Sequence, residues 1–223
     1  TVVPPNRRLA QELARGFDAF QIAKGLSVWE DADILPFGAF AERLWEDALY
    51  SEIAARMPAL LAPEQERECW EQVIAESEWG GKLLAPAQTA TQCADAWHLA
   101  HRWRIAGALG VFPGNEDAEA FAQWSKTYLA RTPGDIDAAR LPDAVVPLLG
   151  ERALRKPRQL VAYAFDILPP QTADFFRACG DAGIELHHCG PVRQNTNPVR
   201  VACASARAEL EAAARWARAR LEA

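Results

Sequence analysis

Two adjacent arginines, Arg7 and Arg8, stand where the sequence predicts the first turn of a helix. Cations there oppose the helix macrodipole and cost on the order of a few tenths of a kcal/mol. Asn6 precedes them and is suited to cap the helix. Free backbone N–H groups, the positive end of the helix and two guanidinium groups together predict an anion site that suits a phosphate. The alternative is that both arginine side chains are simply solvated.

Histidine and cysteine side chains offer the other candidate chemistry. His98 and His101 lie one helical turn apart, but the sequence places no third ligand beside them. His187, His188 and Cys189 follow one another on a predicted strand, where adjacent side chains point to opposite faces and cannot all bind one ion. We therefore expect structural roles for these residues, with no metal and no cofactor.

Nucleotide-binding loops are missing from the sequence. The stretch "WGGKLL" contains Gly81 and Lys82, but Leu83 follows where a hydroxyl should hold magnesium. There is also no glycine five residues before Gly81, and no G-x-G-x-x-G follows a predicted strand. The residues present thus indicate neither a phosphate-binding P-loop nor a dinucleotide site.

Composition limits the partners. The 223 residues are half hydrophobic and carry a net charge of −6, so any nucleic-acid surface must be a local patch on an acidic protein. No apolar run reaches the roughly 18 residues that a membrane helix needs. The five cysteines are odd in number and scattered, which predicts reduced, mostly buried thiols in a cytoplasmic protein.

Hydrophobic periodicity predicts an α/β chain interrupted by helices. The opening strand "TVV" and an extended segment at 26–36 flank a helix, and a second helix follows from Phe37. Helical periodicity alone then continues through segments 64–78, 87–105 and 116–130, which contain many of the tryptophans. We expect those tryptophans to be core residues.

Strands return in the last third. "LVAYAF" is apolar throughout, as expected for a strand covered on both faces, and a helix follows it. Further strands are predicted at 184–189 and 199–204, and then a final helix from Ser205 whose Leu210 and Leu221 face inward. Alternating strands and helices predict a parallel sheet.

The expected organisation is therefore an α/β domain formed by residues 1–45 and 135–205, with an inserted all-helical subdomain at 46–134. Residues 206–223 are expected to begin a following segment, and the chain to be a fragment of a longer protein.

Four stretches together resemble one family. "TVVPPNRRLAQEL" is similar to helicase motif Ia, which contacts single-stranded DNA; Asn6 and Arg7 match its asparagine and basic residue, whereas its threonines are prolines here. "DILPFGAFAERLW" is similar to the T-x-H-S-F segment, with Phe37 or Phe40 at the aromatic position. "DIDAARLPDAVVPLL" looks like the D-x-x-D-L segment that leads back from the helical subdomain and retains Asp137 and Leu141.

The fourth stretch, "QLVAYAFDILPPQTADFF", resembles the Walker B segment V-D-E-F-Q-D-T-S-P-x-Q. Aligned on Gln171, Asp166 matches the later aspartate, and the magnesium-binding aspartate and catalytic glutamate fall on Ala162 and Tyr163. Replacing both acids removes the carboxylates that hold Mg²⁺ and orient the attacking water. Tyr163 is expected to fill the vacant position.

On these four stretches the chain resembles the N-terminal helicase-like region of the AddB subunit of bacterial AddAB helicase–nucleases and AddB-like proteobacterial DNA repair proteins. These are relatives of UvrD-like superfamily 1 helicases. The resemblance implies a P-loop-NTPase-like, helicase-type α/β fold with a large helical insert. The family's C-terminal PD-(D/E)xK nuclease resembles nothing in this chain, so any nuclease activity would belong to another part of a longer protein.

The resemblance also implies a function: a non-catalytic scaffold that guides DNA in double-strand-break repair and recombination. Weak, sequence-independent contact with single-stranded or duplex DNA would involve Asn6, Arg7, Arg8 and Phe37, and an AddA-like helicase subunit would be a partner. Two alternatives stay open at this point. The region could be a protein–protein interaction module that binds no DNA, or an ATPase domain whose P-loop precedes Thr1.

Overall fold

The computed structural model describes residues 1–111, 114–190 and 200–222. The chain divides into two compact units, Thr1–Pro191 and Val192–Ala223. The first contains the strands and seven α-helices discussed below; the second contains the final helix, α8 (Ala206–Leu221), capped by the Ser205 hydroxyl that accepts from the Ala208 N–H.

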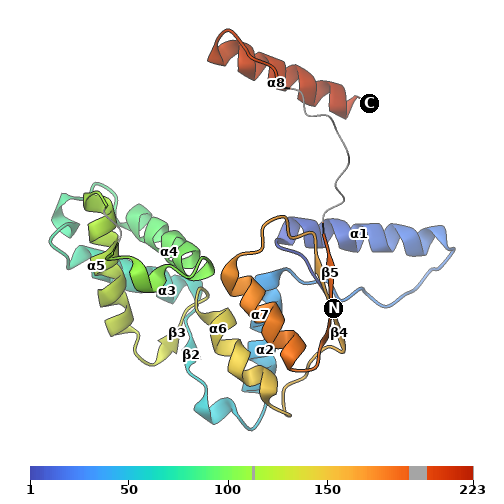
Figure 1. The fold of residues 1–223 in the computed structure, drawn as a ribbon, viewed down its shortest axis with the longest axis horizontal. Coiled ribbons are helices and arrows are strands. Elements are labelled where there is room, and N and C mark those ends of the chain that lie inside the picture. The colour runs from blue at the N-terminus through green and yellow to red at the C-terminus, as the bar shows by residue number, and fades with distance from the viewer. Residues whose placement is uncertain (112–113, 191–199, 223) are drawn as a thin grey trace. The chain divides into compact units, whose positions relative to one another are not determined.

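The first unit contains a small three-stranded parallel sheet (Figure 1). Its strand order is β1 (Val2–Val3), β4 (Gln159–Tyr163), β5 (Glu185–Cys189). Val2 pairs with Val161, and Ile34 forms a parallel bridge to Val2 on the other side of β1. A second, two-stranded parallel sheet joins β2 (Ala59–Leu60) to β3 (Asp135–Ile136). The mixed α/β class and the parallel pairing are therefore confirmed.

Helices cover the main sheet unequally. Figure 1 shows α2 (Phe37–Leu49), α6 (Leu141–Val145) and α7 (Pro170–Asp181) on one side of it, with α1 (Arg7–Ala23) on the other. Asn6 caps α1 as predicted: its Oδ1 accepts from the Leu9 N–H at 2.9 Å. Ala10 is the one residue of α1 that is buried, so this side of the sheet is the less protected one.

The predicted helices of the middle region are confirmed, but residues 46–134 are not all helical, because β2 lies among them and pairs with β3. They are α3 (Pro63–Ala75), α4 (Pro86–Arg102) and α5 (Glu116–Arg131), and Asn115 Oδ1 caps α5 by accepting from the Ala118 N–H. Short 3₁₀ helices connect the elements of the first unit: Ala54–Arg56, Gly80–Lys82, Ala106–Ala108 and Val146–Gly150. Gly80 is needed for packing, because a Cβ there would lie 2.5 Å from the Ala75 carbonyl oxygen.

Two hydrophobic cores form within the first unit. One lies between the sheet and its covered side, where Phe40, Leu160 and Phe175 are each no more than 1% exposed. The other lies among α3, α4 and α5 around Trp70 and Trp97. The expectation that tryptophans form core holds for the buried ones, whereas Trp103 is 45% exposed.

Predictions about the burial of β4, about a strand at 199–204 and about the burial of the cysteines are wrong. In β4 only Leu160 and Ala162 are buried, so the strand is enclosed on one face, because α1 contributes little cover to the other. Of the strand predicted at 199–204, Arg200–Ala204 form no strand, and Val199 lies outside the described residues. Only Cys93 and Cys179 of the five cysteines are buried, and burial raises the pKa of each thiol to about 12.

The final helix is present where it was predicted. Within the second unit nothing covers Leu210 and Leu221, which are 73% and 89% exposed. An i,i+4 charge pair lies on this helix, with Arg207 Nε donating to Glu211 Oε1 at 3.0 Å. Periodicity therefore identified the helix correctly.

No helix among the described residues is long and apolar enough to cross a membrane. Within the same residues, no group of three or more His, Cys, Asp or Glu side chains is arranged to hold a metal ion.

Candidate functional site

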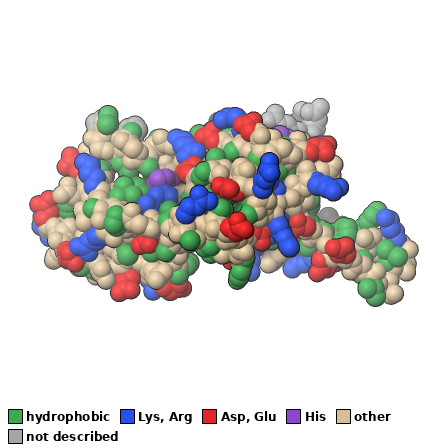
Figure 2. All heavy atoms as spheres, turned by 90° about the horizontal axis from the view of Figure 1, so that it is seen from below, with side chains coloured by type: hydrophobic (Ala, Val, Ile, Leu, Met, Phe, Trp, Pro, Cys, Tyr) green, Lys and Arg blue, Asp and Glu red, His purple; other side chains and the backbone are tan. Residues whose placement is uncertain are grey.

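The predicted anion-binding residues lie at the start of α1. Arg7 and Arg8 are exposed, and neither forms an ion pair with any residue that the structure describes. The Asn6 side chain is engaged as the helix cap. The first turn contains no acidic residue, so both guanidinium groups are available to an anion from solution. Figure 2 shows acidic and basic side chains interspersed over the face it presents.

Phe37, the predicted aromatic contact, is held by other rings. Its centroid lies 5.2 Å from that of Phe175 and 5.7 Å from that of Phe176, both in edge-to-face geometry. Such pairs contribute roughly 0.5–1.5 kcal/mol beyond burial. Phe37 therefore belongs to the sheet core on one side and forms part of a cleft wall on the other.

The degenerate Walker B positions are separated by the pleat of β4. Ala162 is 3% exposed and packs in the core, whereas Tyr163 is half-buried on the opposite face. Asp166 is exposed in the loop before α7. The structure therefore does not bring these three side chains together, and no carboxylate occupies either of the two strand positions.

Gln171 has a role that its motif position did not indicate. It is 2% exposed, and its Nε2 donates to the Ala139 carbonyl at 2.8 Å and to Asp143 Oδ2 at 3.0 Å. Arg104 Nη1 also donates to Asp143 Oδ2, at 2.8 Å, and Arg104 pairs with Asp174 of α7. These bonds join α7 to α6 and to the end of the helical region.

Four of the stretches singled out in the sequence border a single cleft of about 230 Å³. Pro5 lies just after β1, and Phe37 and Gly38 begin α2. Ala139 and Leu141 lie before and at the start of α6, Phe165 follows β4, and Gln171 lies in the first turn of α7. His98 and Arg102 of α4 complete the wall. Ligands of open parallel sheets bind outside the carboxyl ends of the strands, and this cleft adjoins the carboxyl ends of β1 and β4.

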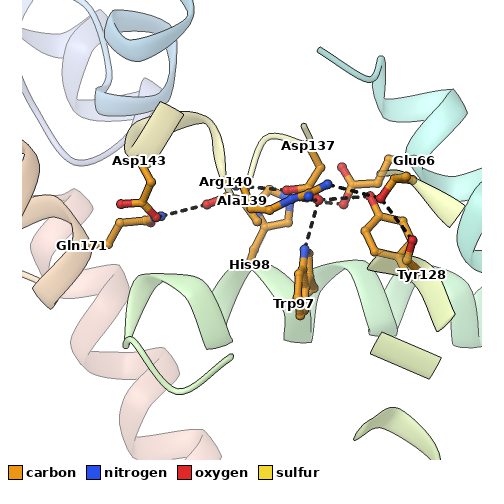
Figure 3. Close-up of polar contacts among 10 residues, drawn as sticks. Glu66, Trp97, His98, Tyr128, Asp137, Ala139, Arg140, Asp143 and Gln171 are labelled. Carbon is orange, nitrogen blue, oxygen red and sulfur yellow. Dashed lines mark hydrogen bonds and ion pairs between the residues drawn. The ribbon is translucent and has the colours of Figure 1, made fainter. Parts of the chain in front are cut away.

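Behind the cleft, Asp137 is the centre of a buried polar network (Figure 3). Asp137 is fully buried, and its Oδ2 accepts from Trp97 Nε1 at 3.1 Å, Tyr128 OH at 3.1 Å and Arg140 Nε at 2.8 Å. Its Oδ1 accepts from the Arg140 N–H at 3.0 Å. Burial, with the neighbouring Asp137 carboxylate, raises the pKa of Tyr128, which therefore stays a donor. The role that the structure supports for Asp137 is therefore to stabilise the fold.

His98 is the residue whose place sequence reasoning missed. Its Nε2 lies 3.8 Å from Oε1 of Glu66, a carboxylate that is 5% exposed. Glu66 raises the pKa of His98 against the opposing effect of burial, which favours the imidazolium form beside the cleft. Its neighbour His101 has its pKa lowered by burial. The available signal was the i,i+4 spacing of His98 and Arg102, which puts two basic groups on one helix face.

Comparison of the chain with models of protein families and with curated proteins finds no match. The assignment of a function therefore depends on the geometry of the cleft and on the two arginines of α1.

Proposed function

We propose that this chain is a non-catalytic, helicase-like scaffold that guides DNA within a double-strand-break repair helicase–nuclease. The observation that carries the proposal is the convergence on one cleft of the four stretches that resemble helicase motifs. They are up to 166 residues apart, from Pro5 to Gln171, and yet meet at the carboxyl ends of β1 and β4. In this proposal the small parallel sheet is the remnant of a P-loop-NTPase-like fold.

DNA contact is assigned to the start of α1. Arg7 and Arg8 combine two guanidinium groups with the N-terminal end of a 17-residue helix that has no acidic residue in its first turn. Asn6 contributes by fixing the helix start, which positions both arginines. Such contacts address the phosphate backbone and carry no sequence information.

Replacing both arginines by alanine is expected to weaken binding to a single-stranded oligonucleotide and to flatten its salt dependence. Each arginine that neutralises a phosphate releases counterions, so the slope of log K against log salt should fall by about 1–2 units. Fluorescence anisotropy of a labelled oligonucleotide at several salt concentrations measures it.

The matched control is the double variant Arg152→Ala with Arg155→Ala. Both of these arginines are exposed, and they precede β4, at the opposite end of the strand from the cleft. The control makes the same change in net charge and should leave the slope close to that of the unmodified chain. Equal slopes in the two double variants would refute the role of Arg7 and Arg8.

We expect no ATP hydrolysis by this chain. The two strand positions that would supply the magnesium-binding and water-orienting carboxylates hold Ala162 and Tyr163, and Asp166 lies in the loop beyond the strand. Phosphate release should equal the protein-free blank with and without single-stranded DNA. DNA-stimulated release that disappeared in Asp166→Ala would contradict the alignment on Gln171.

One observation favours a second candidate, a protein-interaction module. Apolar side chains on α1 and in the segment after it are exposed: Phe20 by 55%, Ile22 by 62% and Val28 by 84%. An AddA-like helicase subunit is the partner that the first proposal would place there. An unchanged oligonucleotide affinity in the Arg7, Arg8 double variant, together with subunit binding lost in Ile22→Asp, would favour this module.

A further inference from the structure

The cleft has features of an anion site that the DNA-guiding role does not use. Two helices, α2 and α7, begin at it, and neither has a side-chain cap. The Phe37 N–H donates to the Pro4 carbonyl, and Pro170 has no N–H. Among the described residues, nothing accepts from the N–H groups of Gly38, Gln171 and Thr172, all of which line the cleft.

The side chain of Thr172 is a second indication that the cleft binds a ligand. Thr172 is 2% exposed, and its hydroxyl has no hydrogen-bond partner in the part of the chain that the structure describes. The hydroxyl is not among the fully enclosed polar atoms, and Thr172 lines the cleft. Since a hydroxyl can both donate and accept a hydrogen bond, the Thr172 side chain can bond a ligand in the cleft.

The charges on the cleft wall favour an anion. Arg102 of α4 forms no ion pair with any described residue, and His98 is four residues before it on the same helix. Glu66 stands behind His98 and raises its pKa. The opposing charge in the wall is Glu42 of α2, which is exposed.

We propose that this cleft binds a phosphate group through the N-terminal ends of α2 and α7, the Thr172 hydroxyl, Arg102 and His98. The volume of about 230 Å³ is below the roughly 300–1,000 Å³ of pockets for drug-sized ligands, so it suits a phosphate and a small part of the molecule that carries it. Phe37, Leu141 and Phe165 provide apolar walls for that part. The proposal does not depend on the DNA-guiding role of Arg7 and Arg8.

Titration with inorganic phosphate at constant ionic strength tests the site directly. In two-dimensional ¹H–¹⁵N NMR spectra, the amide signals of Gly38, Gln171 and Thr172 should move together and saturate. Arg102→Ala and Thr172→Val should each weaken binding by about 10-fold or more, since a hydrogen bond to a charged group contributes roughly 1.5–3 kcal/mol. Arg67→Ala on α3, where the arginine side chain is 58% exposed, is the control and should bind phosphate normally.

The source of the phosphate is decided by competition. A nucleoside monophosphate, an oligonucleotide with a 5′-phosphate and one with a 5′-hydroxyl are each added to the phosphate-bound protein. Displacement by all three assigns the site to a backbone phosphodiester as well as a terminal phosphate, and displacement by the first two alone assigns it to a terminal phosphate. Both outcomes support the site.

Signals of Gly38, Gln171 and Thr172 that do not move with phosphate, or equal affinities in Arg102→Ala, Thr172→Val and Arg67→Ala, would overturn the proposal. Unchanged amide signals elsewhere in each variant show that it has folded. The salt-slope measurement on the Arg7, Arg8 double variant is independent of these titrations, so either proposal can fail while the other stands.

Discussion

Replacing Asp137 by alanine is expected to lower the free energy of unfolding by about 3–5 kcal/mol, because it leaves buried donors without an acceptor. Asp137 is fully buried and accepts from Trp97, Tyr128 and Arg140. In its absence the Arg140 guanidinium, which is 19% exposed, loses its counter-charge. Folded domains are stable by only about 5–15 kcal/mol, so this single change removes a large fraction of the total.

Urea unfolding followed by circular dichroism measures the loss. Asp181→Ala is the matched control, because Asp181 is exposed in the last turn of α7, where a carboxylate opposes the macrodipole. The control should change stability by no more than about 0.5 kcal/mol. Tyr128→Phe removes one donor and keeps the ring, so its loss should be well below that of Asp137→Ala. A loss in Asp137→Ala as small as the control's would contradict the network.

Replacing Trp70 by alanine is expected to lower the free energy of unfolding by about 3–5 kcal/mol, through lost burial and the cavity that remains. Trp70 is fully buried in the helical core. Its ring is stacked on Tyr128 with centroids 4.2 Å apart and an interplanar angle of 5°, and on Phe121 at 6.2 Å. No other ring contact in this core is as close and parallel among the described residues.

Two further variants show whether the loss of stability comes from the packing of Trp70 or from the removal of any tryptophan. Trp103→Ala removes an indole that is 45% exposed and should cost much less. Trp70→Phe should also cost less than Trp70→Ala, because it keeps an aromatic ring and removes an Nε1 that has no hydrogen-bond partner among the described residues. Chemical unfolding monitored by the fluorescence of the remaining tryptophans gives the comparison. Equal losses at Trp70 and Trp103 would refute the assignment of Trp70 to a packed core.

The parts of the structure that the sequence determined by itself are local. The caps at Asn6, Asn115 and Ser205 each bond a backbone N–H three residues later, and the predicted helices start at or next to them. Apolar periodicity likewise located α3, α4 and α5 to within a few residues. These features depend on residues within one or two helical turns, and those neighbours are visible in the sequence itself.

The sequence could not show which faces of a strand or helix are covered by other elements. The apolar pattern of β4 predicts cover on both faces, but Val161 is only half-buried. A pattern states which side chains would gain from burial and not whether a partner exists. Residues 200–204 of the strand predicted at 199–204 form no strand, and a strand needs a neighbour with which to pair.

The candidate site was decided by tertiary structure. Sequence motifs pointed to Phe37, Asp137 and Gln171 one at a time, and only the fold shows that Phe37 and Gln171 share a cleft while Asp137 lies in the network behind it. Asp137 meets Trp97 across 40 residues of sequence, and Gln171 meets Ala139 across 32. Contacts of this kind form because the packing of the two cores buries polar groups that need hydrogen-bond partners. The partners come from distant parts of the chain, so the local spacing of residues does not identify them.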